Sequence, residues 1–188
     1  MRAGALLGAA VLLVGAAGIG RLAGRDGGLL RVAQLLDHPL LFGGLAFVSA
    51  VAGICLAVRK TVVRWAVAGT AVLVLIPFTP LALLLLTTAG QEQTLDEAAP
   101  GRSDRRLVVT EGSAMIDPLW WVYVDSGSGL GVRRWQVAHI NGDFSGALVE
   151  AAWDGPDRIR LVMSAAERET YIVELGPDGR PLRTVTKG

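Results

Sequence analysis

The residues that could support catalysis lie around one turn. His139, Asp143 and Ser145 have the side-chain types of a hydrolytic triad, in which a histidine activates a serine and a carboxylate orients the histidine. Ser145 does not lie in a nucleophile elbow, the sharp glycine-flanked turn that presents a catalytic serine. We therefore interpret His139 as a strand-end residue beside the Asn141-Gly142 turn, and we keep a hydrolase as the third functional hypothesis.

A glycine-rich segment, residues 127–131, is the other pattern with chemical potential. Such loops cradle phosphate groups when they follow a strand and open a helix, whose N-terminus then faces the anion. Here the segment leads into Val132–Ile140, where residues alternate as in a strand, and no Lys-Ser or Lys-Thr pair follows. We interpret it as a hairpin loop.

The chain contains few residues that could bind a metal through histidine or react as a thiol. His38 and His139 are the two histidines, and we expect them on different sides of a membrane interface. The single cysteine, Cys55, lies in an apolar stretch, where a thiol is inert and has no partner for an intramolecular disulfide. The sequence therefore predicts no metal, no cofactor and no catalytic residue, and a protein that is not an enzyme.

Exposed aromatic and basic side chains are the expected agents of any recognition. Trp120 and Trp121 are adjacent in one predicted strand that is apolar on both faces, so we expect both to be core residues. The alternative is that one ring stays partly uncovered and contacts a partner or the bilayer. Arg133 and Arg134 lie on opposite faces of the next strand and do not form one basic patch. We expect one of these arginines to pair with a carboxylate.

The elements that position these residues divide the chain in two. Residues 3–20, 39–58 and 65–88 contain no Asp, Glu, Lys, Arg or His. A hydrocarbon core about 30 Å thick needs roughly 20 apolar helical residues to cross it, and lipid forces backbone groups to pair within the helix. We therefore predict a transmembrane domain over residues 1–90, with three helices and the lipid bilayer as a partner.

Small residues and prolines mark these helices. Four glycines of the first helix fall within about 80° of arc at 100° per residue: Gly4, Gly8, Gly15 and Gly18. This glycine stripe allows close helix contact, so we expect it to pack against the other helices of the chain, or against another chain. In the third helix, Pro77 and Pro80 predict a kink, where the Thr79 hydroxyl can bond a carbonyl freed by a proline.

Basic residues near the helix ends indicate the orientation, because cytoplasmic loops carry an excess of Lys and Arg. Arg59, Lys60 and Arg64 form the densest basic cluster, whereas residues 91–101 contain none. We predict a multi-pass protein of the plasma (inner) membrane with a cytoplasmic N-terminus and an extracytoplasmic C-terminal domain. A cleaved signal peptide over residues 1–20 is the alternative and leaves the C-terminal domain on the same side.

Residues 21–38, between the first two spans, predict a short amphipathic helix in the interface or an ordinary connecting helix. Beyond the spans, polar residues 91–104 predict a linker, and an all-β domain follows over 105–188. Two-residue alternation predicts seven strands, near residues 106–110, 119–125, 132–140, 147–153, 158–163, 170–175 and 182–186. Short turns between them favour an antiparallel meander, as a sandwich or open barrel, with residues 119–124 as a central strand and with Trp135 and Trp153 in the core.

Charge follows the same division. Residues 1–90 carry seven basic and two acidic residues, whereas residues 91–188 carry eleven basic and fifteen acidic ones. An acidic soluble domain is unsuited to nucleic acid. Sixteen of the eighteen basic residues are arginine, which is typical of a GC-rich bacterial source. We expect a bacterial integral membrane protein whose β domain recognises a protein or an envelope component. The alternative is an accessory or assembly subunit that docks on a transporter or secretion complex through its helices.

Overall fold

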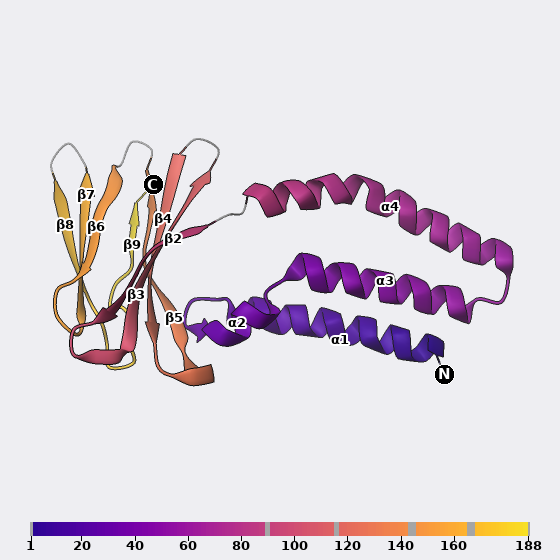
Figure 1. Ribbon diagram of the computed structural model, residues 1–188, viewed down its shortest axis with the longest axis horizontal. Coiled ribbons are helices and arrows are strands. Elements are labelled where there is room, and N and C mark those ends of the chain that lie inside the picture. Colours follow the sequence, from indigo (N-terminus) through magenta and orange to yellow (C-terminus); the bar gives the residue numbers. More distant parts are fainter. Residues whose placement is uncertain (1, 89–90, 115–116, 143–145, 165–167, 188) are drawn as a thin grey trace. The chain divides into compact units, whose positions relative to one another are not determined.

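The structure is a computed structural model and describes residues 2–88, 91–114, 117–142, 146–164 and 168–187, without the side chains of residues 77, 81–88 and 114. N-terminal helices are followed by antiparallel β sheets, which confirms the predicted order of the two halves (Figure 1). Two compact units are present: Met1–Gly24 with Val32–Ala89, and Arg25–Arg31 with Gly90–Gly188. The second unit, the β domain, therefore includes a short segment from between the first helices.

The helical unit is built from α1 (Arg2–Ala23), α2 (Leu30–Leu36), α3 (Pro39–Ala57) and α4 (Thr61–Thr88). In the described chain, α1 and α3 are long and apolar enough to cross a membrane. The apolar segment described for α4, Thr61–Ile76, is shorter. Two of the three predicted spans thus have candidates, and the third remains a prediction.

The first helix packs along α3 through small residues, but not through its glycine stripe. Ala10 and Ala46 are buried, and a Cβ added at Gly53 would lie 3.0 Å from Leu7 Cγ. A Cβ would meet no atom within 4 Å at any glycine of the stripe, Gly4, Gly8, Gly15 or Gly18. The stripe faces away from every described helix, so the expectation that it packs within the chain is wrong. Contact with another chain stays a prediction.

The fourth helix continues through both of its prolines. The Thr79 hydroxyl donates to the Leu75 carbonyl, 2.9 Å away and four residues earlier. The carbonyls that lose a donor are those four residues before each proline, and Leu75 is not one of them. Thr79 therefore bonds back along its own helix turn, and its predicted role is wrong.

Two sheets form the β domain. The larger has the order β1-β5-β4-β3-β2, with β9 parallel to β5, and the smaller has the order β6-β7-β8 (Figure 1). The strands are β1 (Gly28–Leu29), β2 (Glu92–Ala99), β3 (Arg102–Ala114), β4 (Asp117–Ser126), β5 (Arg133–Asn141), β6 (Ala147–Trp153), β7 (Arg158–Ser164), β8 (Glu169–Glu174) and β9 (Val185–Lys187). The predicted central strand is confirmed, because β4 lies between β3 and β5.

The core lies between the sheets, because inward-facing residues of both contribute to one apolar cluster. Leu107, Val109 and Val122 of the larger sheet join Ile159 and Leu161 of the smaller. Two-residue alternation along β3 and β7 explains why these side chains share a face. The sequence pattern of the predicted strands therefore identifies most of the core.

The predicted linker over 91–104 is wrong, because residues 92–99 form β2 and β3 begins at residue 102. β2 is the edge of its sheet, and Leu95 is its only large apolar residue. A solvated edge strand does not need the alternation that marks buried strands. The sequence of β2 therefore resembles a polar connection.

Residues 21–38 also differ from the prediction, since they contain β1 as well as the helix α2. β1 pairs antiparallel with the start of β5, and the Asp26 carboxylate accepts a hydrogen bond from the backbone amide of Gln136 at 2.7 Å. Gly27 has φ +73°, and a Cβ there would lie 2.2 Å from the Trp135 ring. Trp135 is therefore covered by this segment rather than by the core cluster, whereas Trp153 packs against that cluster as predicted.

Candidate functional site

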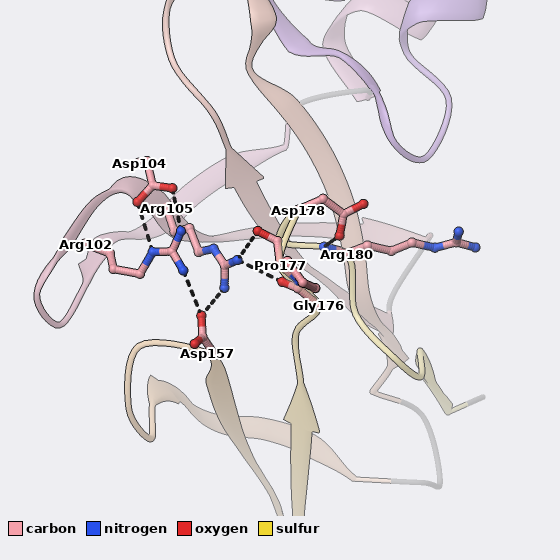
Figure 2. Close-up of polar contacts among 8 residues, drawn as sticks. All are labelled: Arg102, Asp104, Arg105, Asp157, Gly176, Pro177, Asp178 and Arg180. Atoms are coloured by element: carbon pink, nitrogen blue, oxygen red, sulfur yellow. Dashed lines mark hydrogen bonds and ion pairs between the residues drawn. The ribbon is translucent and has the colours of Figure 1, made fainter.

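The most connected polar group in the β domain is the arginine cluster, which comprises Arg102, Asp104, Arg105 and Asp157 (Figure 2). The Arg105 side chain extends from β3 and is fully buried. It donates to the Asp157 carboxylate and to the carbonyl oxygens of Gly176 and Pro177, at 2.8 and 2.7 Å. One buried guanidinium thus joins β3 to the β6–β7 turn and to the turn after β8.

The second arginine of the cluster balances the remaining charges. Arg102 donates to Asp104 at 2.8 Å and to Asp157 at 3.2 Å. The hydrogen bond from Arg102 lowers the pKa of Asp104, and the same bond raises the pKa of Arg102. Each carboxylate of the cluster is paired with an arginine. The geometry of the cluster fits a clamp that holds two turns against β3.

The two arginines predicted for recognition instead hold the sheet together. Arg134 makes two hydrogen bonds of 2.7 Å to Asp125 and lies 5.0 Å from the Tyr123 ring centre. Burial is the largest influence and lowers the pKa of Arg134, but the hydrogen bonds and the charge attraction from Asp125, with smaller contributions from Tyr123 and Asp96, together make the net shift upward. This confirms the expected pairing with a carboxylate. Arg133 is exposed and donates to the Gly27 carbonyl at 2.9 Å, which secures β1.

The adjacent tryptophans of β4 lie on opposite faces of the strand. Trp120 is buried in the core, and Trp121 is half-buried on the other face. Trp121 stacks on His139 with ring centres 5.5 Å apart and planes inclined by 23°. The described contact of His139 is therefore aromatic; Asp143 and Ser145 lie outside the described residues.

The glycine-rich segment connects β4 to β5. Its last residues, Gly129–Gly131, form a single 3-10 turn, and the strand β5 begins at Arg133. A phosphate cradle of the expected kind requires a helix after the loop. The interpretation as a hairpin loop is confirmed.

A groove of about 330 Å³ opens where the edges of the two sheets approach one another. Its walls come from the edge strands β2 and β6, and its base comes from β3 and β4. The lining residues are Thr94, Leu95, Val109, Glu111, Trp120, Leu148, Val149, Glu150 and Ala151. One end of the space between β2 and β6 is closed by the Trp153 indole, which donates to the Glu97 carbonyl at 3.2 Å. We refer to this space as the edge groove.

Carboxylates dominate the charge of the edge groove. Glu150 of β6 accepts a hydrogen bond from Arg160 at 2.7 Å. Glu111 of β3 has no ion pair within the described part of the chain, and it lies directly opposite Glu92 in the β2–β3 ladder. Like charges in this position repel across the strands. The groove therefore combines an apolar base with uncompensated negative charge.

Metal binding finds no support in the described ranges, where no three His, Cys, Asp or Glu residues group closely enough to hold an ion. A comparison of the chain with protein-family models, with curated proteins and with solved structures finds no match.

Sequence reasoning missed both Arg105 and Glu111. Their signal lies in the alternation of β3, since Arg105, Leu107, Val109 and Glu111 occupy every second position. Leu107 and Val109 face the core, so the same face carries one charged residue at each end. A charge at an inward position of a predicted strand marks a site that needs a partner. Arg105 and Glu111 lie one position beyond the two ends of the predicted strand near 106–110, so extending its alternation by one residue at each end identifies both.

Proposed function

We propose that this is a multi-pass protein of the bacterial plasma membrane that presents a non-enzymatic recognition domain. In this proposal α1, α3 and α4 cross the bilayer, the N-terminus is cytoplasmic and the β domain is extracytoplasmic. The domain recognises another protein or a component of the cell envelope.

The pairing of β1 with β5 is the observation that carries the proposal. β1 lies between α1 and α3 in the chain, yet Gly28 and Leu29 pair with Arg134 and Arg133. Strands of one sheet occupy one side of a membrane, so the chain must return to that side between β1 and β2. Consequently α3 and α4 both cross, or neither does. Because α3 is long and apolar enough to cross, this parity supports a crossing by α4.

The charge of the connecting segments supports the orientation. The segment between α3 and α4 contains Arg59 and Lys60, and Arg64 lies in the first turn of α4. If both helices cross, this basic end lies on the side opposite to the β domain. Cytoplasmic loops carry an excess of Lys and Arg, so this charge pattern supports an outer location for the β domain.

Single-cysteine labelling in intact cells tests the topology. In a Cys55→Ala background, cysteines replace Arg25, Lys60 or Leu182, and a membrane-impermeant maleimide is applied before and after permeabilisation. We expect the cysteines at positions 25 and 182 to react in intact cells and the cysteine at position 60 to react only after permeabilisation. Labelling of positions 25 and 182 from opposite sides would exclude the proposed arrangement.

The edge groove supports recognition as the role of the β domain, because an apolar base with open strand edges is typical of a surface that binds a partner. Deletion of residues 105–188 should abolish the cellular role while leaving the helices in the membrane. An unchanged phenotype in a strain that carries the deletion would reject the recognition function. Membrane fractionation of the truncated protein provides the control for insertion.

A second candidate function is that of an accessory subunit, and the glycine stripe of α1 favours it. The stripe, Gly4, Gly8, Gly15 and Gly18, faces away from the described helices, and glycine allows another membrane helix to approach closely. Cross-linking in intact cells separates the two functions. Contacts confined to residues 3–20 would favour the accessory role, whereas contacts through the β domain would favour recognition.

A further inference from the structure

The two inward-facing charged residues at the ends of β3, Arg105 and Glu111, have different surroundings. At one end Arg105 is matched by Asp157 and by two carbonyl oxygens. At the other end Glu111 faces the edge groove, with no ion pair in the part of the chain that the structure describes. Inward charges on an edge strand can serve to prevent aggregation. β3 is not an edge strand, because β2 and β4 flank it, so this explanation does not apply to Glu111.

The surroundings of Glu111 add to its charge instead of neutralising it. Glu92 lies directly opposite Glu111, which places two carboxylates across one ladder position. Elsewhere between the sheets, charges are matched: Lys187 of β9 lies 3.0 Å from Glu169 of β8. A cross-strand pair of like charges costs stability. The mouth of the groove is therefore complementary to a cation supplied by another molecule.

The walls of the groove are two strand edges. Among the described strands, β2 pairs with β3 alone and β6 pairs with β7 alone. The Val109 carbonyl faces β2, where it accepts a hydrogen bond from Thr94, so Leu95, which lies opposite Val109, directs its backbone groups toward β3. By two-residue alternation the next residue, Asp96, directs its amide and carbonyl to the free edge. These are the backbone groups that bind an extended peptide by strand addition.

Each of these edges carries a β-bulge at the groove. Thr94 is the extra residue of β2, between Gln93 and Leu95, and Val149 is the extra residue of β6. Both line the groove. Bulges end regular pairing and redirect side chains next to binding sites. The two bulged residues therefore line the same groove as Glu111.

The base of the groove suits the side chain of a basic residue. Trp120, Val109 and Leu95 provide apolar contact for the methylene groups of a lysine or arginine, whose charged end then reaches Glu111. The face of an indole also attracts a cation. A volume of about 330 Å³ accommodates side chains from one short segment rather than a whole domain.

We infer that the edge groove binds an extended polypeptide segment of a partner protein. The segment adds to the free edge of β2 and places a lysine or arginine side chain against Glu111. This inference rests on the proposed recognition function and names the chemistry of its partner.

Synthetic peptides provide the test, with the full chain in lipid nanodiscs. The probe is a fluorescein-labelled peptide, TKVKVKT, and binding is followed by fluorescence anisotropy. Two matched peptides replace each lysine with glutamate, or carry N-methyl groups on alternate backbone amides. We expect the lysine peptide to bind, the glutamate peptide not to bind, and N-methylation to weaken binding at least about tenfold, because strand addition needs the amides.

Two variants assign the site. Glu111→Gln should weaken binding of the lysine peptide by about tenfold, since it removes a charge-assisted hydrogen bond worth roughly 1.4 kcal/mol. Glu174→Gln, at an exposed glutamate of β8 outside the groove, is the control and should leave binding unchanged. The thermal midpoint of each variant verifies folding, and the peptide pair tests charge preference without any variant.

Several results would overturn the inference. These are equal binding of the lysine and glutamate peptides, binding by neither, or binding that survives Glu111→Gln. A rise in thermal midpoint with Ca²⁺ alone that depends on Glu111 would show a cation site instead. Self-association that the lysine peptide disrupts would identify a second copy as the occupant. Each of these leaves the labelling and deletion tests of the recognition function unaffected, so the two failures are distinguishable.

Discussion

Replacement of Arg105 by alanine should destabilise the β domain more than any surface substitution. The guanidinium is fully buried and donates to Asp157, Gly176 and Pro177. The Gly176 carbonyl keeps a second donor, the backbone amide three residues later, but no other donor to Pro177 is observed within the described residues. Asp157 is half exposed, so its charge interaction contributes little after solvent screening.

The magnitude follows from these contacts. Hydrogen bonds from a charged group contribute about 1.5–3 kcal/mol each, and breaking a buried charged network costs about 3–5 kcal/mol. A domain of this size has a total stability of only about 5–15 kcal/mol. We therefore expect Arg105→Ala to lower the free energy of unfolding by about 3–5 kcal/mol. Arg105→Met retains much of the side-chain volume and should recover part of that loss.

Urea unfolding of the full chain in detergent micelles measures the effect, because four of the five tryptophans lie on strands β4, β5 and β6 and report on the β domain. Arg160→Ala is the matched control, since Arg160 pairs with Glu150 on the surface and its loss should cost no more than about 1 kcal/mol. A loss below about 1 kcal/mol for Arg105→Ala, or full stability of Arg105→Met, would refute the clamp.

Three further predictions use the same measurements. Gly27→Ala should release β1, because the new Cβ would lie 2.2 Å from the Trp135 indole ring, and hydrogen exchange at β1 should accelerate. Gly101→Ala is the control: Gly101 has a similar φ of +71° but no neighbouring atom, so the substitution should cost only roughly 1–2 kcal/mol. A hydrogen bond from Arg106 lowers the pKa of Asp96 below its ordinary value of 3.8. Because the pKa of Asp96 is lower in the folded than in the unfolded protein, its ionised carboxylate stabilises the fold at pH values above the unfolded-state pKa. This stabilisation is lost as the pH falls through the folded-state pKa. Stability should therefore decline below pH 3.8, less steeply in Arg106→Gln, and identical acid profiles would contradict this. Glu111→Gln should raise stability by about 0.2–1 kcal/mol by removing a like-charge pair, and destabilisation would show that the carboxylate has a structural partner.

The strands that could be predicted are those whose own residues show the apolar pattern of a buried strand. β4 and β7 bury one or both faces, so their apolar residues show directly in the sequence. The turn at residues 154–157 is equally local, because Gly155 with φ +116° supplies a conformation that glycine adopts readily. These elements required no knowledge of distant contacts.

The elements that escaped prediction depend on distant partners. β1 has two residues, and the Arg133–Gly27 hydrogen bond that secures it spans 106 positions. β2 is an exposed edge strand whose composition matches a linker. No periodicity arises from such pairing, because the side chains of these strands are not sorted between a core and solvent.

The candidate site follows the same division. Trp120 and the Arg134 pairing were predictable from strand alternation, since residue types on one face limit the available partners. The edge groove was not predictable from the sequence, because it forms only where β2 lies near β6 and the polar sequence of β2 resembles a linker. The inward position of Glu111 was the accessible signal.

The attachment of β1 has a practical consequence for anyone who truncates this protein. A fragment that starts at residue 91 appears to contain the whole strand domain, but it lacks the partner of Arg133 and Arg134 on β5. That fragment would expose bare backbone donors and acceptors, which invite dimers by strand exchange and insoluble aggregates. We expect that grafting residues 25–31 onto such a fragment through a flexible tether would restore the missing edge.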